Sequence, residues 1–151
     1  QLGQVLGFPL AGFAGETNMI SHATLTHTTT LRALSAHIES TLQRAPLVIG
    51  DPEKLVQKVA WCTGAAQDYI EDAIALGVDA FISGEISEQT THQALESGVS
   101  YISAGHHVTE RYGVQALGQH LADKFVLYQT LIKYNFNYVL GKCIMRKVLI
   151  E

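Results

Sequence analysis

The residue types best suited to chemistry lie in one short segment, Gly-His-His-Val-Thr-Glu at residues 105–110. His106 and Glu110 are four residues apart, so at the start of a helix their side chains would share one face. An imidazole and a carboxylate placed together are suitable ligands for Zn, Mn, Fe or Ni. Two simpler interpretations stay open. Glu110 could favour the positive end of the helix dipole, and His106 could be a hydrogen-bonded loop residue.

Three other side chains are candidates for roles near such a site. Glu85 lies just after the predicted strand that ends at Ser83, where it could orient a metal-binding histidine or act as a helix N-terminal charge. His92 lies in a helical pattern near Glu88, where it could transfer protons or simply bond to backbone or water. Cys62 ends an apolar run, which favours a buried inert thiol over a nucleophile.

A regular alternation of strands and helices over residues 55–123 would position these residues. Apolar periodicity and turn residues predict strands ending near Cys62 and over 79–83 and 99–104, and helices over 68–76, 88–97 and 108–122. The β-α-β-α-β-α order predicts an α/β fold with a mostly parallel sheet and helices covering it. Polar residues follow each predicted strand, and the carboxyl ends of neighbouring parallel strands meet at one edge of a sheet. We therefore expect the candidate residues to converge there.

The rest of the chain divides into two further regions. Residues 1–50 predict short strands and turns followed by one helix over 31–43, with Thr30 as a candidate N-cap. Residues 124–151 differ in composition, because they hold five of the ten Lys and Arg residues and one of the fourteen Asp and Glu residues. This basic, aromatic tail sets a boundary near Asp123, after the α/β region of residues 51–123.

Composition excludes several classes of protein. The formal net charge of −4 and the acidic body argue against a nucleic-acid-binding protein. No apolar run reaches the length of about 18 residues that a membrane span needs. Two cysteines are too few for a disulfide framework, and no signal peptide is visible, so we expect a reducing, cytoplasmic location.

Several motifs together resemble one known family. They are Val-Ala-Trp-Cys-Thr-Gly at 59–64, Gly-Val-Asp-Ala-Phe-Ile-Ser-Gly-Glu at 77–85, His-Gln-Ala at 92–94 and Ala-Gly-His-His-Val-Thr-Glu at 104–110. In order and spacing these resemble the C-terminal half of the NIF-three-like family, also called GTP cyclohydrolase type-two homologues, in its short bacterial form. By this resemblance, residues 1–50 match the segment that joins the two halves of the family.

The resemblance implies a dinuclear metal site in which His106 and Glu110 are ligands. The remaining ligands of the family come from its N-terminal half, which has no match in this chain. The family forms homo-oligomers, often hexameric rings with the metal sites facing an internal cavity. The basic aromatic tail departs from the family pattern, which indicates either a change of reading frame near Phe125 or a natural extension that binds a partner or a membrane surface.

Two functions follow from the resemblance. The first is a metal-dependent hydrolase acting on a small phosphorylated or nucleotide-like substrate, with Glu85 and His92 as catalytic or orienting groups and with the site incomplete in this chain. The second is a non-catalytic, ring-forming metal-binding scaffold or interaction protein. The cyclohydrolase label is a weak guide to the substrate, because it rests on homology naming.

Overall fold

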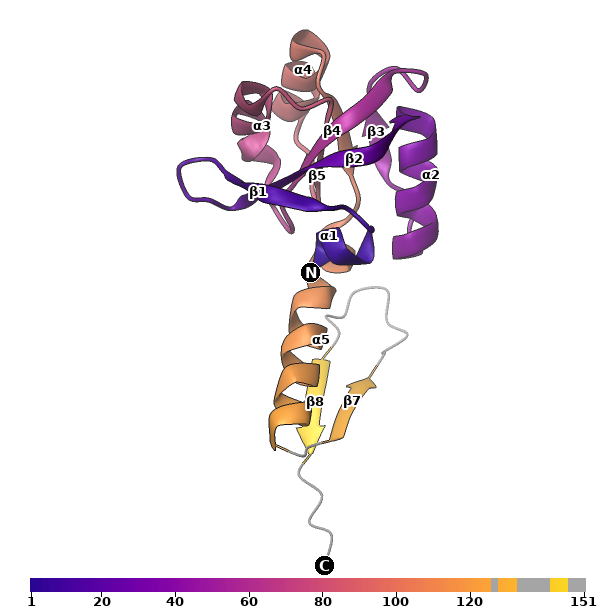
Figure 1. The fold of residues 1–151 in the computed structure, drawn as a ribbon. Coiled ribbons are helices and arrows are strands. Elements are labelled where there is room, and N and C mark those ends of the chain that lie inside the picture. The colour runs from indigo at the N-terminus through magenta and orange to yellow at the C-terminus, as the bar shows by residue number, and fades with distance from the viewer. Residues whose placement is uncertain (126–127, 133–141, 147–151) are drawn as a thin grey trace, which may run out of the picture.

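A computed structural model describes residues 1–125, 128–132 and 142–146 (Figure 1). The elements in chain order are α1 (Leu2–Val5), β1 (Leu10–Ala14), β2 (Ile20–Thr30), α2 (Leu31–Leu42), β3 (Leu47–Ile49), β4 (Leu55–Trp61), a 3-10 turn (Gln67–Tyr69), α3 (Ile70–Leu76), β5 (Ala80–Ser83), α4 (Glu88–Ser97), β6 (Ser100–Ser103), α5 (His106–Phe125), β7 (Tyr128–Ile132) and β8 (Lys142–Arg146). The predicted β-α-β-α-β-α order is confirmed as β4-α3-β5-α4-β6-α5. The tail predicted from residue 124 onward lies partly outside the described residues.

The main sheet is mixed. Its six strands have the order β1-β2-β4-β5-β6-β3. The pairs β4–β5 and β5–β6 are parallel, as predicted for residues 55–123. The pairs β1–β2, β2–β4 and β3–β6 are antiparallel. The prediction of a mostly parallel sheet is therefore wrong for the sheet as a whole, because residues 10–49 add three antiparallel strands to the three parallel ones.

The sheet is covered on both faces. Side chains of a β-strand alternate between the faces, so Val59 and Trp61 of β4 join a core with α1 and α2, whereas Ala60 and Cys62 join a second core with α3 and α4. Figure 1 shows α2 on one side of the sheet and α3 and α4 on the other. This double coverage explains why the β5 strand is buried along its whole length.

Helix α5 departs from the expected covering role. Only its first turns pack against the core, through the partly buried Val108 and Tyr112. The helix then extends away from the sheet and runs beside the separate β7–β8 hairpin (Figure 1). Val114 and Leu117, in the part of the helix beyond the sheet, are 45% and 57% exposed. A 20-residue helix is about 30 Å long. Because strands β5 and β6 are much shorter, α5 cannot pack against them along its whole length.

Helix α2 begins where the sequence predicts. Thr30 has extended backbone angles, and its hydroxyl oxygen accepts a hydrogen bond of 3.2 Å from the backbone N–H of Ala33. The backbone N–H groups of Leu31 and Arg32 donate to the carbonyls of Lys54 and Pro52. The N–H groups of Leu31, Arg32 and Ala33 are therefore all hydrogen-bonded within the chain. None of the helices in the described residues is both long and apolar enough to cross a membrane.

The cap at Thr30 gives a stability prediction. Replacing Thr30 with Ala removes the acceptor for the Ala33 N–H, so we expect the free energy of unfolding to fall by about 1 kcal/mol. Urea denaturation followed by circular dichroism measures the change. Thr30→Ser keeps the hydroxyl and should retain most of the stability. Equal losses in the two variants would contradict the capping role.

Candidate metal centre

Three loops meet at the carboxyl edge of the parallel strands, as predicted. Backbone hydrogen bonds continue past the strand ends, from the N–H of Gly84 to the carbonyl of Gly64 and from the N–H of Gly105 to the carbonyl of Gly84, each 3.0 Å long. The buried hydroxyls of Ser83 and Ser103 donate to the same two carbonyls, over 3.3 Å and 3.2 Å. The loops after β4, β5 and β6 are thereby fixed to one another.

The close approach of the loops depends on glycine. A Cβ atom at Gly84 would lie 2.6 Å from the Gly64 carbonyl oxygen and 2.7 Å from the Cα of His106. Both contacts involve backbone atoms, which cannot move aside without a large loss of stability. Gly64 has a φ of +71° and leaves room for the Glu110 carboxylate, from which a Cβ would be only 2.4 Å away. The loops could not approach this closely with larger residues.

Thr109 connects the helical part of the site to the loop after β4. Its buried hydroxyl donates to the carbonyl of His106 over 2.8 Å and accepts from the N–H of Gly64 over 3.1 Å. Thr109 is not among the site residues predicted from the sequence, although its place in the motif between His106 and Glu110 was a signal. Thr109 therefore fixes the first turn of α5 against the Gly64 loop.

His106 lies between two carboxylates. Its Nδ1 is 2.6 Å from an Oε1 atom of Glu85, and its Nε2 is 3.1 Å from Oε2 of Glu110. The structure thus brings together three of the four predicted site residues, and the spacing of four residues does place His106 and Glu110 on one helix face. The three side chains are 44%, 46% and 47% exposed, so the site is open on one side.

Tyr101 makes a hydrogen bond to the backbone of Glu85. This fully buried residue of β6 donates its hydroxyl proton to the Glu85 carbonyl over 2.7 Å. Burial raises the pKa of Tyr101 to about 12, so the hydroxyl keeps its proton at neutral pH and remains a donor. Tyr101 consequently fixes the loop from which the Glu85 carboxylate reaches His106.

The two carboxylates change the protonation of His106. The hydrogen bond that His106 donates to Glu85 is the largest cause that raises the pKa of His106, and the negative charge of Glu110 adds to it, while partial burial opposes the rise. Both carboxylates therefore favour the imidazolium form in the chain alone. A cation bound to Nε2 would replace the proton there and would balance the negative charge of the same carboxylates.

The residues present fit part of a metal site. With Glu85 accepting from Nδ1–H, a His106 ring that has lost its Nε2 proton would present a lone pair to a cation shared with the Glu110 carboxylate, and Gly64 leaves space beside both groups. Within the described part of the chain, no group of three or more His, Cys, Asp or Glu side chains is placed to hold a metal ion. His106 and Glu110 therefore offer two ligands rather than a full set.

The other candidates lie apart from this cluster. His92 is exposed on α4, and no hydrogen bond or ion pair joins it to Glu85, His106 or Glu110 in residues 1–125. Its predicted role in proton transfer stays a prediction. Cys62 is buried, and burial raises the pKa of its thiol, so the thiol stays protonated at neutral pH.

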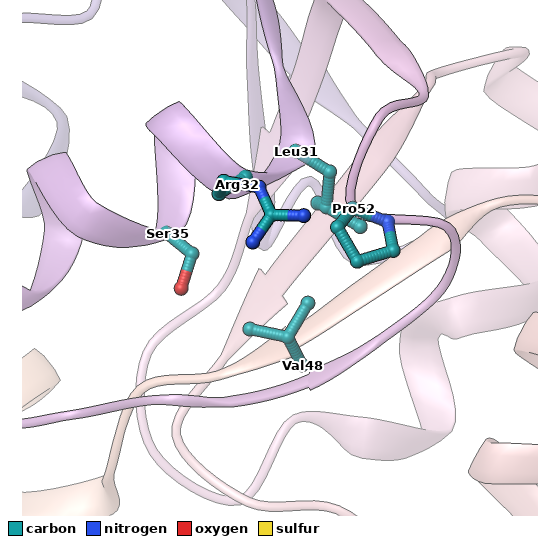
Figure 2. A pocket seen from close by; sticks show the side chains of 5 residues that line it. All are labelled: Leu31, Arg32, Ser35, Val48 and Pro52. Carbon is teal, nitrogen blue, oxygen red and sulfur yellow. The ribbon is translucent and has the colours of Figure 1, made fainter.

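A surface pocket lies elsewhere, between the start of α2 and strand β3. Figure 2 shows the five side chains that line it: Leu31, Arg32, Ser35, Val48 and Pro52. Its one charged group, the Arg32 guanidinium, is paired with Glu53 at 2.7 Å. The pocket therefore offers mostly apolar surface and is separate from the His106 cluster.

Comparison with known proteins places the chain in a family. A sequence model described as Duf34/NIF3 (NGG1p interacting factor 3) matches residues 2–137. The chain belongs to the Duf34/NIF3 family. This confirms the resemblance drawn from the motifs at 59–64, 77–85 and 104–110, and the match also includes residues 2–50 and part of the tail.

Individual relatives are similar over part of their length. A Neisseria meningitidis serogroup B protein named "GTP cyclohydrolase 1 type 2 homolog" is 50% identical over 127 residues, which cover 84% of this chain and 51% of that protein. A protein of the same name from Pseudomonas aeruginosa is 55% identical over 91 residues, which cover 60% of this chain and 36% of that protein. The chain thus spans about half the length, or less, of these Duf34/NIF3 relatives.

Solved structures support the same fold. Protein ybgI, described as of unknown function, superposes with a TM-score of 0.77 and 45% identity over 82% of this chain and 49% of that one. A Thermus thermophilus protein superposes with a TM-score of 0.73 over 91% of this chain and 54% of that one, and its 23% identity supports the fold alone. The Duf34/NIF3 fold is therefore established for the chain.

The glycine packing at the site gives a prediction. Gly84→Ala places a methyl group against backbone atoms of Gly64 and His106, so we expect the free energy of unfolding to fall by about 2 kcal/mol or more. Gly113→Ala is the matched control, because no atom lies within 4 Å of its added Cβ. In a helix interior that control should be neutral or stabilising by about 0.5 kcal/mol. Thermal or urea unfolding compares the two, and similar stabilities would contradict the close packing.

Proposed function

We propose that this chain supplies His106 and Glu110 as ligands of a divalent metal ion in a metal-dependent hydrolase. The supporting observation is that Nε2 of His106 and the Glu110 carboxylate lie 3.1 Å apart while Glu85 holds the other ring nitrogen. A carboxylate at Nδ1 fixes the tautomer that leaves Nε2 for a metal, which is a common arrangement around metal-binding histidines. Zn, Mn, Fe and Ni all accept this pair of ligands.

The chemistry follows from the kinds of group at the site. When bound, a divalent ion lowers the pKa of water and stabilises negative charge on a phosphoryl or carbonyl oxygen. Glu85 orients the His106 ring and holds a proton at Nδ1, and His92 is retained as a candidate for proton transfer. A small phosphorylated or nucleotide-like molecule is the proposed substrate, in keeping with the cyclohydrolase-homologue name of the relatives.

A complete site would need further ligands and a second metal ion, by resemblance to the family. We propose that they come from the part of the relatives that this chain does not span, or from another chain in a homo-oligomer such as a hexameric ring. Exposed apolar side chains on edge strand β1, on α4 and on α5 support such assembly; they include Leu10, Phe13, Leu95, Val114 and Leu117. A cytoplasmic location stays a prediction.

A non-catalytic metal-binding scaffold is the second candidate. It is favoured by the small number of ligands, because no third His, Cys, Asp or Glu joins His106 and Glu110 in a metal-binding group within the described residues. In that case the metal ion would stabilise an interface between chains instead of activating water. The two functions share the same ligands and differ in turnover.

Metal binding tests the ligand assignment. We expect the chain to bind Mn²⁺ in equilibrium dialysis and His106→Ala or Glu110→Ala to weaken binding by more than about tenfold, since each removes a ligand. Glu85→Gln should weaken it by about tenfold, because the His106 ring loses its orienting carboxylate. His120→Ala, an exposed histidine on the same helix, is the control and should bind normally. Equal affinity in all variants would refute the assignment.

Turnover separates the enzyme from the scaffold. We expect Mn²⁺- or Zn²⁺-dependent hydrolysis of a small phosphate ester or cyclic nucleotide, measured by released phosphate or by chromatography of the products. His106→Ala should reduce the rate to background, and His120→Ala should not change it. Metal binding at His106 without hydrolysis of any phosphate ester or cyclic nucleotide tested would favour the scaffold.

A further inference from the structure

The guanidinium group of Arg44 lies directly against Gly105, the residue before His106. A Cβ atom on Gly105 would be 2.6 Å from Nη1 of Arg44 and 2.8 Å from its Cζ. Gly105 is buried and has a φ of +106°, a conformation that favours glycine. The absence of a side chain at this position therefore admits a cationic group to the edge of the sheet that holds His106.

The topology of the sheet explains how Arg44 reaches this edge. Strand β3 runs antiparallel to β6, with Leu47 opposite Ser103. Residues just before β3 therefore lie beside residues just after β6. Gln43, in a left-handed conformation, ends α2 and turns the chain toward this position. Arg44 thus comes from a fourth loop that joins the three loops of the metal centre.

Arg44 differs from the other arginines of residues 1–125 in its contacts. Arg32 is paired with Glu53, and Arg111 donates to the Leu42 carbonyl and the Tyr112 hydroxyl. Within those residues, no hydrogen bond or ion pair is made by Arg44, although the carboxylates of the site are attached to the neighbouring loop and helix. Its donors are therefore available to a ligand.

We propose that Arg44 binds the phosphate group of the substrate at the His106–Glu110 site. A guanidinium is planar and presents paired N–H donors that match two oxygens of a phosphate. The inference rests on the proposed function and narrows the substrate to the phosphorylated class. A bound metal ion and Arg44 together would offset the negative charge of Glu85 and Glu110, which otherwise repel an anion.

Binding of inorganic phosphate to the full chain tests the proposal. Isothermal titration calorimetry with and without Mn²⁺ measures the phosphate affinity of the wild type, Arg44→Ala, Arg44→Lys and Arg32→Ala. We expect Arg44→Ala to weaken phosphate binding by about tenfold or more. Arg44→Lys should recover part of the loss, because it keeps the charge without the planar pair of donors. Arg32→Ala, an exposed arginine elsewhere, should match the wild type.

The result is distinguishable from failure of the metal assignment. Mn²⁺ affinity, measured separately by dialysis, should be the same in Arg44→Ala as in the wild type, whereas His106→Ala reduces it. Phosphate affinity that is unchanged in Arg44→Ala, or no phosphate binding by the wild type in either condition, would overturn the role of Arg44. Equal Mn²⁺ affinity in the wild type and His106→Ala would instead overturn the proposed metal site.

Discussion

The candidate site depends on backbone hydrogen bonds that extend the parallel sheet beyond its strands. The carbonyls of Gly64 and Gly84 each accept from the N–H of the next loop, and the serine hydroxyls beneath them satisfy the same oxygens. This packing needs residues without side chains at the crossing points, since a Cβ at Gly84 would meet backbone on two sides. The side chains that could do chemistry are therefore attached to a nearly rigid frame.

The frame matters because the ion pairs alone could not hold the cluster. Glu85, His106 and Glu110 are each close to half exposed, and exposed ion pairs contribute little to stability because water and salt screen them. Their positions instead depend on buried groups. Tyr101 binds the backbone of Glu85, and Thr109 links the first turn of α5 to Gly64. The hydrogen bonds of the buried Tyr101 and Thr109 therefore fix the positions of the side chains in the surface cluster.

Local sequence patterns predicted the strands and helices of residues 55–123. The rest of the fold depends on strand pairing and packing between residues that are distant in the sequence. The strands over residues 55–103 are rich in apolar residues, and Gly77 and Gly98 end the helices between them, so the order of these elements and the meeting of Glu85, His106 and Glu110 were predictable. Strand β2 has few apolar residues, and its many threonines indicate a strand without indicating a partner. The direction of α5 and the position of Arg44 likewise depend on neighbours remote in sequence.

The charges at this edge imply an order of binding. The first 123 residues hold thirteen of the fourteen acidic residues, and two of them flank His106, so the surface around the site repels anions. A bound divalent cation would be the largest local charge and would reverse that field close to Arg44. Without the cation, Arg44 and the imidazolium form of His106 only balance the two carboxylates, so the site has no excess positive charge to attract a phosphate. Under the proposed function, the cation would therefore bind before an anionic substrate, and Arg44 would contribute a second positive group once the cation is in place.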